Sequence, residues 1–216
     1  VVSGDFPWSF ERGKYIYIAA VDCTGHGVPG ALLSFVGYFN LINIVDHDID
    51  IETGEILDKL HNNVQETLKQ KAKNATTRDG MDIALCKINK ETNELEYSGA
   101  HRPMYLLNNK NEIKEYKGDR KAIGGIPMAK YKKRKFTTHK VNYEEGQRVF
   151  IFSDGLPDQF RDGKPKKFSN KRIKQLIKNN NDKDMNAMRS IFENEFYMWK
   201  GDGMQLDDVL LIGFKM

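Results

Sequence analysis

Residues 20–33 of the chain read AVDCTGHGVPGALL, which combines the end of an apolar run, a glycine-rich turn and the start of a second apolar run. The residues just before, Tyr15 to Val21, are a run of β-forming side chains. Apolar residues are dense enough among them to predict a strand in a sheet that is buried on both faces. This strand ends on Asp22, two glycines flank His26, and Pro29 suits the first turn of the apolar helix that follows. Together they place a carboxylate, an imidazole and backbone groups at one open edge, where a metal or a phosphate can bind. Glycine and proline also punctuate ordinary loops, so this stretch alone leaves a plain turn open.

The composition predicts a soluble globular protein, because 39% of the 216 residues are hydrophobic and 30% are charged. The net charge of +4 is too mild to indicate a nucleic-acid partner. Two cysteines, Cys23 and Cys86, exclude a disulfide framework and a cysteine-based zinc site, and they favour a reducing, cytoplasmic compartment. The longest apolar run, Ala31 to Val45, is too short to span a bilayer, so no membrane span is predicted in this chain. Because the chain begins with Val1, we expect it to be the C-terminal part of a longer protein, whose upstream segments could attach it to a membrane.

The periodicity predicts two N-terminal helices and two C-terminal ones. The helix from Pro29 to about Val45 is apolar on nearly all sides, which is typical of a helix packed between layers. A second helix, about Thr53 to Lys71, has one apolar face. Two more are expected near Asn170 to Lys178 and Lys183 to Trp199.

The strands are expected mainly in the middle of the chain. Four short ones, joined by tight turns, predict an antiparallel meander: Met81 to Ile88, Leu95 to Ala100, Pro103 to Leu107 and Glu112 to Tyr116. Three more are expected at Phe136 to Tyr143, Arg148 to Ser153 and Leu206 to Phe214. No linker or repeat divides the chain, so residues 1–216 are predicted to form a single domain.

Four acids, Asp5, Asp22, Asp154 and Asp207, share one local setting, a strand end or strand start beside a glycine or a turn; Asp208 follows the last of them. Several carboxylates collected from separate strands can hold two hard divalent cations, which activate a water for phosphoryl displacement. Without cations the carboxylates would repel one another. The sequence alone does not show that they converge.

These motifs resemble, in order and spacing, those of the metal-dependent (PPM-type) serine/threonine protein phosphatases, and among them the bacterial SpoIIE-like, RsbU-type subgroup. The motifs are Ser3-Gly4-Asp5-Phe6, Asp22-Cys23-Thr24-Gly25-His26-Gly27, Ser153-Asp154-Gly155 and Gln205-Leu206-Asp207-Asp208. Asp79 to Leu85 and Tyr97 to Pro103 are similar to the middle-sheet segments of that family, and the match covers nearly the whole chain. The resemblance implies an α+β fold of two packed antiparallel sheets flanked by helices, an α-β-β-α sandwich.

The resemblance also implies a site and an activity. Asp22 would bridge two divalent cations, Mn²⁺ or Mg²⁺, with the backbone carbonyl of Cys23 on one of them. Asp154 and Asp207 would complete the pair, and Asp5 would bind directly or through waters. Asp208 is expected to support these ligands from behind. The implied reaction is hydrolysis of phosphoserine or phosphothreonine in a bacterial signalling protein, of the anti-sigma-factor-antagonist kind, with an upstream sensor or dimerising segment in the parent chain.

Several alternatives stay open at this point. His26 could donate a proton to the leaving oxygen or could hold the turn by hydrogen bonding. Cys23 has no catalytic histidine pattern beside it, which argues against a nucleophilic role. No counterpart is evident for the arginine that grips phosphate in the eukaryotic branch. The main alternative function is a non-catalytic sensor or scaffold module with the same fold, although the full acid set favours an enzyme.

Overall fold

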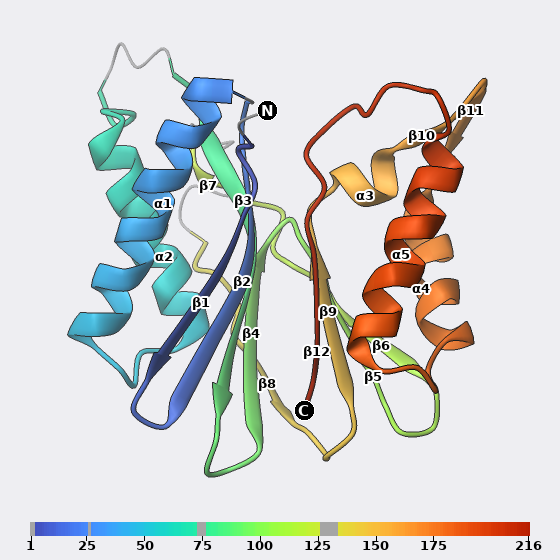
Figure 1. Ribbon diagram of the computed structural model, residues 1–216. Coiled ribbons are helices and arrows are strands. Elements are labelled where there is room, and N and C mark those ends of the chain that lie inside the picture. Colours follow the sequence, from blue (N-terminus) through green and yellow to red (C-terminus); the bar gives the residue numbers. More distant parts are fainter. Residues whose placement is uncertain (1–2, 26, 73–76, 126–133) are drawn as a thin grey trace.

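The computed structural model describes residues 3–25, 27–72, 77–125 and 134–216. They form two packed antiparallel sheets with helices on both outer faces, as Figure 1 shows. The α-β-β-α fold implied by the family resemblance is therefore confirmed.

The first sheet contains six strands and carries two helices on its outer face. Its order is β1 (Phe6–Arg12), β2 (Tyr15–Cys23), β3 (Gly80–Asn89), β4 (Glu94–Ala100) and β8 (His139–Asn142), and β7 (Ile123–Gly124) pairs with β3. The covering helices are α1 (Gly27–His47) and α2 (Thr53–Thr67).

The second sheet contains four strands, in the order β12 (Leu211–Lys215), β9 (Arg148–Phe152), β5 (Met104–Leu107) and β6 (Ile113–Tyr116). Its outer face carries α4 (Ser169–Asn179) and α5 (Met185–Lys200). A short helix α3 (Gly155–Asp158) and the hairpin of β10 (Phe160–Arg161) and β11 (Lys164–Lys167) lie at one end.

The apolar residues of β2 are buried on both faces of the first sheet. Tyr17 and Val21 belong to the core beneath α1 and α2, whereas Ala20 belongs to the core between the two sheets. Successive side chains of a strand point to opposite faces, so a strand between two layers needs apolar residues at nearly every position. A third core lies between the second sheet and α4 and α5. By the same alternation, Asp22 lies on the face toward the second sheet.

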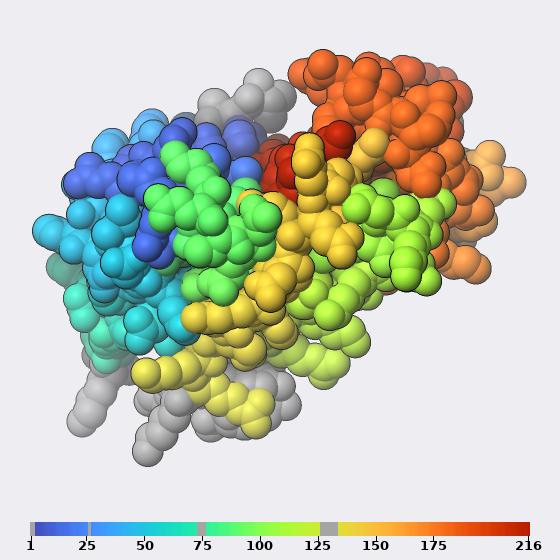
Figure 2. All heavy atoms as spheres, turned by 90° about the horizontal axis from the view of Figure 1, so that it is seen from below, coloured from blue at the N-terminus to red at the C-terminus, as the bar shows by residue number. Residues whose placement is uncertain are grey.

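Seen from the end opposite to α3, the two halves of the molecule are in contact. The red atoms of the C-terminal strand lie between the blue atoms of the N-terminal hairpin and the orange atoms of the late helices, as Figure 2 shows. The strands β2 and β9 end at the opposite end of the sandwich, where α1 and α3 begin, as Figure 1 shows, and Asp22 and Asp154 lie there.

The predicted single meander is wrong. β3 pairs with β4 in the first sheet, whereas β5 pairs with β6 in the second. The chain crosses between the sheets at His101 to Pro103, where His101 takes a positive φ of 59°. A turn this short resembles a hairpin turn in the sequence, but its backbone directs the chain to the other sheet.

The helix α1 also differs from its prediction, because it lies on the outside of the sheet rather than between layers. One face, which includes Leu33, Leu41 and Val45, is buried. The other exposes Leu32 and Phe35, whose exposed fractions are 61% and 60%. A composition that is apolar on all sides does not reveal which side faces the core.

By length and composition, α1 is the one helix within the described ranges that could cross a membrane. The helix has 21 residues and is therefore longer than the apolar run on which the prediction of no span rested. Core helices of soluble proteins pass the same test, and a third of the apolar window is buried here. The observation is therefore weak evidence for a span.

The remaining elements follow their predictions with small shifts. The strand predicted from Phe136 begins at His139, and the one predicted from Leu206 begins at Leu211. Leu206, ahead of β12, bonds to a side chain instead of to a neighbouring strand: its N–H donates to Gln159 Oε1 at 3.2 Å. The acids at 207 and 208 consequently lie in a loop.

Candidate metal centre

The strand β2 delivers Asp22 to the edge of the sandwich beside a second acid. In the antiparallel register, Asp22 lies directly opposite Asp82 of β3. Directly opposite residues of two neighbouring strands lie on the same face, about 5 Å apart at Cβ, where two negative charges destabilise the sheet unless a cation is present. Thr24 secures this edge, because its Oγ1 donates to the Gly80 carbonyl at 2.9 Å and accepts from the Gly80 N–H at 2.8 Å.

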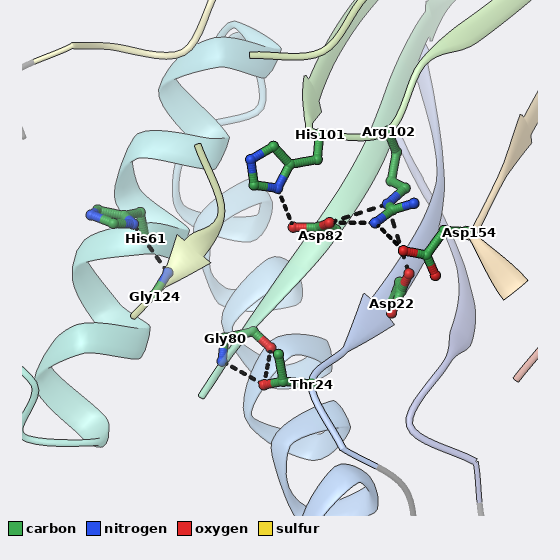
Figure 3. Close-up of polar contacts among 9 residues, drawn as sticks. All are labelled: Asp22, Thr24, His61, Gly80, Asp82, His101, Arg102, Gly124 and Asp154. Atoms are coloured by element: carbon green, nitrogen blue, oxygen red, sulfur yellow. Dashed lines mark hydrogen bonds and ion pairs between the residues drawn. The ribbon is translucent and has the colours of Figure 1, made fainter. Parts of the chain in front are cut away.

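The cation beside both acids is Arg102, which comes from the crossover between the sheets. Its Nη2 lies 2.6 Å from Asp82 Oδ2 and 2.7 Å from Asp154 Oδ2, and its Nε lies 3.7 Å from Asp22 Oδ2. Figure 3 shows the guanidinium pointing at the three carboxylates. His101 Nδ1 lies 2.9 Å from the other oxygen of Asp82. Asp82 thus pairs with the Arg102 guanidinium and with the His101 imidazole, whose pKa its hydrogen bond raises, in a role that the sequence did not predict.

Asp154 and the Asp207–Asp208 loop can approach each other because Gly155, between them, has no side chain. Asp154 follows β9 and precedes Gly155, and a Cβ on Gly155 would lie 1.9 Å from the Asp208 carbonyl oxygen. Any larger residue would push the loop away. Asp154 and Asp207 both line a hollow of about 240 Å³, together with Asp158, Phe160, Lys167 and Leu206.

The N-terminal segment reaches the same place. The Gly4 N–H donates to Asp208 Oδ2 at 2.9 Å, which ties the segment that carries Asp5 to the loop before β12. Gly4 has no room for a side chain, because a Cβ there would lie 2.6 Å from the Gly25 carbonyl oxygen. Asp208 therefore holds the backbone beside Asp5, an arrangement that favours a supporting role for it over direct ligation.

Burial and mutual repulsion raise the pKa of two of these acids. Burial, and then the charges of Asp5 and Asp154, raise the pKa of Asp22 to about 8, although Arg102 opposes the shift. Burial raises the pKa of Asp5 to about 6, against a hydrogen bond from Ser153 that lowers it. When Asp5 and Asp22 are ionised, the nearby positive charges and hydrogen bonds thus offset their negative charges only in part.

The donor chemistry fits hard divalent cations. Asp5 Oδ2 and Asp22 Oδ2 are buried and accept no hydrogen bond from the residues that the structure describes, so each has lone pairs that a cation could use. The geometry is not that of a finished metal site, since within the described part of the chain no three His, Cys, Asp or Glu side chains are placed to hold one ion.

Two other predicted residues need separate mention. Cys23 ends β2, and burial raises the pKa of its thiol to about 12, so the thiol is not ionised at neutral pH and is unsuited to nucleophilic attack. His26 lies outside the residues that the structure describes.

Arg102 is the site residue that sequence reasoning missed. It stands in a His-Arg-Pro run that was assigned to the middle sheet, and a short polar connection of this kind carries no signal for ion pairs with Asp22 and Asp154, which lie 80 and 52 positions away. The clue in the sequence was the excess of acids at strand ends, which requires a cation nearby.

Without divalent cations, we expect the stability of the protein to fall as the pH rises from 6.5 to 9. The folded state holds the Asp22 proton up to a pKa of about 8, whereas the unfolded chain releases it near pH 4, so stability is lost as the pH passes through the folded pKa. Buried His61, with a pKa lowered to about 4, acts in the opposite direction but only below pH 6.5. The 1.5 units between pH 6.5 and a pKa of about 8 correspond to a loss on the order of 2 kcal/mol, at about 1.4 kcal/mol per unit.

Thermal unfolding in the presence of a chelator measures this effect, and Asp22→Asn is the matched control because it cannot titrate. The variant should show a flatter pH dependence and exceed the wild type in stability near pH 9. A wild-type stability that is constant or rising across this range would contradict the assigned environment of Asp22.

A further hollow, of about 550 Å³, lies between α5 and β12. Apolar side chains such as Phe150, Met188 and Phe192 line it, and the predicted metal ligands are not among its described lining residues. The candidate site is the acidic cluster, and not this larger hollow, because the packing of the fold does not require so many carboxylates in one place. The acidic cluster consists of Asp5, Asp22, Asp82, Asp154, Asp207 and Asp208.

Comparison with known proteins gives a consistent result. The family model described as Stage II sporulation protein E (SpoIIE) matches residues 12–216. No curated protein matches the chain. Among solved structures, the chain is similar to the SiaA PP2C domain of Pseudomonas aeruginosa, with 24% identity, a TM-score of 0.86, and coverage of 100% of this chain and 81% of that one.

Two further structures show the same fold. The first contains the PP2C phosphatase domain and a fragment of the regulatory domain of SpoIIE from Bacillus subtilis, with 15% identity and a TM-score of 0.78; the match covers all of this chain but 59% of that one. The second is RsbX in complex with magnesium, with 18% identity, a TM-score of 0.63, and coverage of 99% and 87%. At these identities the likeness to solved structures establishes the fold alone.

Proposed function

The chain belongs to the SpoIIE family of PP2C-type phosphatase domains, and from that premise we propose that it is a metal-dependent phosphatase acting on phosphoserine or phosphothreonine in a bacterial signalling protein. The observation that carries the proposal is the gathering of acids from distant parts of the chain, two of which have buried oxygens that accept no hydrogen bond from any described residue. The burial of these carboxylate oxygens destabilises the folded protein, so we attribute it to a functional role of the acids.

We propose that Asp22, Asp154, Asp207 and the Cys23 carbonyl would hold two divalent cations, Mn²⁺ or Mg²⁺, with Asp22 as the shared ligand. Asp5 would bind them directly or through waters. Such ions supply a water of lowered pKa and neutralise phosphoryl oxygens. The remaining work belongs to the chain itself. Asp208 positions the Asp5 segment through the Gly4 N–H, and Gly155 allows Asp154 to approach the 207–208 loop.

The hollow beside Asp154 and Asp207 is the proposed site for the phosphorylated side chain. Its rim carries a single basic residue among the described lining residues, Lys167, whose Nζ lies 3.0 Å from Asp158 Oδ2. Half of the Lys167 side chain is exposed, so it can turn toward an acidic or phosphorylated segment. His26 remains a candidate proton donor to the leaving oxygen, with a purely structural role in the turn as the alternative.

The proposed substrate is a phosphorylated protein of the anti-sigma-factor-antagonist kind, as the family resemblance implies, and an upstream sensor or dimerising segment is proposed to control the activity. The chain spans less than two thirds of the SpoIIE chain that it matches, so regulation by further segments is a proposal about the whole protein.

The direct test is release of inorganic phosphate from matched peptides that carry phosphoserine, phosphothreonine or phosphotyrosine, with Mn²⁺ or Mg²⁺ present. We expect the first two peptides to be hydrolysed and the third to be a poor substrate. Failure of every peptide with either cation, from protein shown to be folded, would favour the alternative of a non-catalytic module with the same fold.

A further inference from the structure

Backbone hydrogen bonds, as well as side-chain contacts, hold Arg102 in the acidic cluster. The Tyr97 hydroxyl donates to the Arg102 carbonyl oxygen, and the Arg102 N–H donates to the Ala100 carbonyl at 2.7 Å. The neighbouring His101 N–H donates to the Asp119 carbonyl at 2.8 Å. The backbone around Arg102 is thus held from two sides, in a turn where a non-glycine residue takes a positive φ. Such a turn costs energy, and here it directs a guanidinium into the site.

Burial restricts the movement of the Arg102 side chain out of the site. Its exposed fraction is 15%, and those of Asp22 and Asp82 are both 17%. An arginine stays protonated at any ordinary pH, so its charge is permanent. Partly buried charge-assisted contacts at 2.6 and 2.7 Å are worth more than surface ion pairs.

The carboxylates that Arg102 contacts fall into two groups. Asp22 and Asp154 are proposed cation ligands, whereas Asp82 is not. Asp82 Oδ2 accepts from both Nε, at 3.2 Å, and Nη2, at 2.6 Å, of the guanidinium. This pair can persist when the bond to Asp154 is broken.

Resting on the proposed function, we infer that Arg102 is a resident cation of the site: it competes with the divalent cations for Asp154 and Asp22, and it stays anchored on Asp82 when they bind. An oxygen hydrogen-bonded to a guanidinium and a nearby positive charge both oppose the approach of a metal ion. Binding therefore breaks the contact with Asp154, and the free energy of that contact is subtracted from the affinity for the cation.

The test is calorimetric titration of Mn²⁺ into the wild type and Arg102→Gln, which removes the charge but keeps a polar side chain. We expect the dissociation constant to fall about ten-fold or more in the variant. Arg12→Gln is the matched control, since Arg12 makes a half-exposed surface ion pair with Asp46 at 2.8 Å, and its affinity should equal that of the wild type.

Arg102→Lys separates direct pairing from charge acting at a distance. Lysine keeps the charge but loses the planar fork, so it should bind Mn²⁺ more tightly than the wild type and less tightly than Arg102→Gln. If Arg102→Gln does not fold without cations, the Mn²⁺ affinity of Arg102→Lys is compared with that of the wild type instead. A second readout is the Arg102 Nε–H resonance, identified by its loss in Arg102→Lys, which should shift as diamagnetic Mg²⁺ is added.

The outcomes are distinct. Equal or weaker Mn²⁺ binding by Arg102→Gln overturns the competition. A lysine variant identical to the wild type beside a tighter glutamine variant assigns the effect to long-range charge and overturns the displacement of the Asp154 contact. If no form of the protein binds Mn²⁺, the proposed metal-dependent function fails and this inference with it. Because binding is measured without turnover, an inactive protein that still binds Mn²⁺ more tightly as Arg102→Gln would support the inference alone.

Discussion

Asp22→Asn is expected to lower the turnover number for a phosphoserine peptide by about 10³-fold or more, which corresponds to about 4 kcal/mol of transition-state stabilisation. Asparagine has nearly the same shape as aspartate but no charge, so it cannot bridge two cations. The loss combines weaker cation binding with a weaker field on the attacking water. The structure supports this central position, because Asp22 is influenced electrostatically by Asp5, Asp82, Asp154 and Arg102 together.

The measurement is steady-state kinetics over a range of Mn²⁺ concentrations, which separates weakened cation binding from lost chemistry. Asp46→Asn is the matched control, because Asp46 is half-exposed and lies near the far end of α1, roughly 30 Å along the helix from its start. Circular dichroism should show both variants folded. A folded Asp22→Asn protein with near wild-type turnover at saturating Mn²⁺ would refute the role assigned to Asp22.

Removal of divalent cations is the second change with a large expected effect. A chelator in excess should reduce phosphopeptide hydrolysis to the rate without enzyme, and added Mn²⁺ or Mg²⁺ should restore it. The physical reason is that the predicted ligands are all oxygens, the donors that hard divalent cations prefer, and the proposed attacking water is activated by those cations. The alternative nucleophile at this edge, Cys23, is buried with a raised pKa.

The same experiment has a readout that does not depend on turnover. Cations that bind the folded protein stabilise it by about 2.7 kcal/mol at a hundred times their dissociation constant. The midpoint of thermal unfolding should therefore rise with Mn²⁺ in the wild type and much less in Asp22→Asn. Undiminished hydrolysis in excess chelator would rule out the metal-dependent mechanism.

These expectations concern one end of the sandwich, where segments 200 residues apart in the chain meet. The bond from Gly4 to Asp208 and the close approach of Gly155 to the same loop make the site sensitive to the spacing of the two sheets. The ion pair of Arg102 with Asp154 also joins the two sheets, since Arg102 follows β4 of the first sheet and Asp154 follows β9 of the second.

The sequence by itself determined the elements and the identity of the acids. The apolar residues at nearly every position of Tyr15 to Val21 predicted a strand buried on both faces, which β2 is. The acids at strand ends, in the order and spacing of a known family, predicted the candidate site before any contact was known. Both are local properties, written in periodicity and in short motifs.

The tertiary structure decided how these parts combine. The turn at His101 to Pro103 reads like a hairpin turn, yet it carries the chain to the second sheet and places Arg102 among three carboxylates. The apolar composition of α1 gave no indication of which side is buried. Such pairings depend on the crossing of the chain and on the packing of one sheet against another, so residues far apart in the sequence meet at distances that no local pattern encodes.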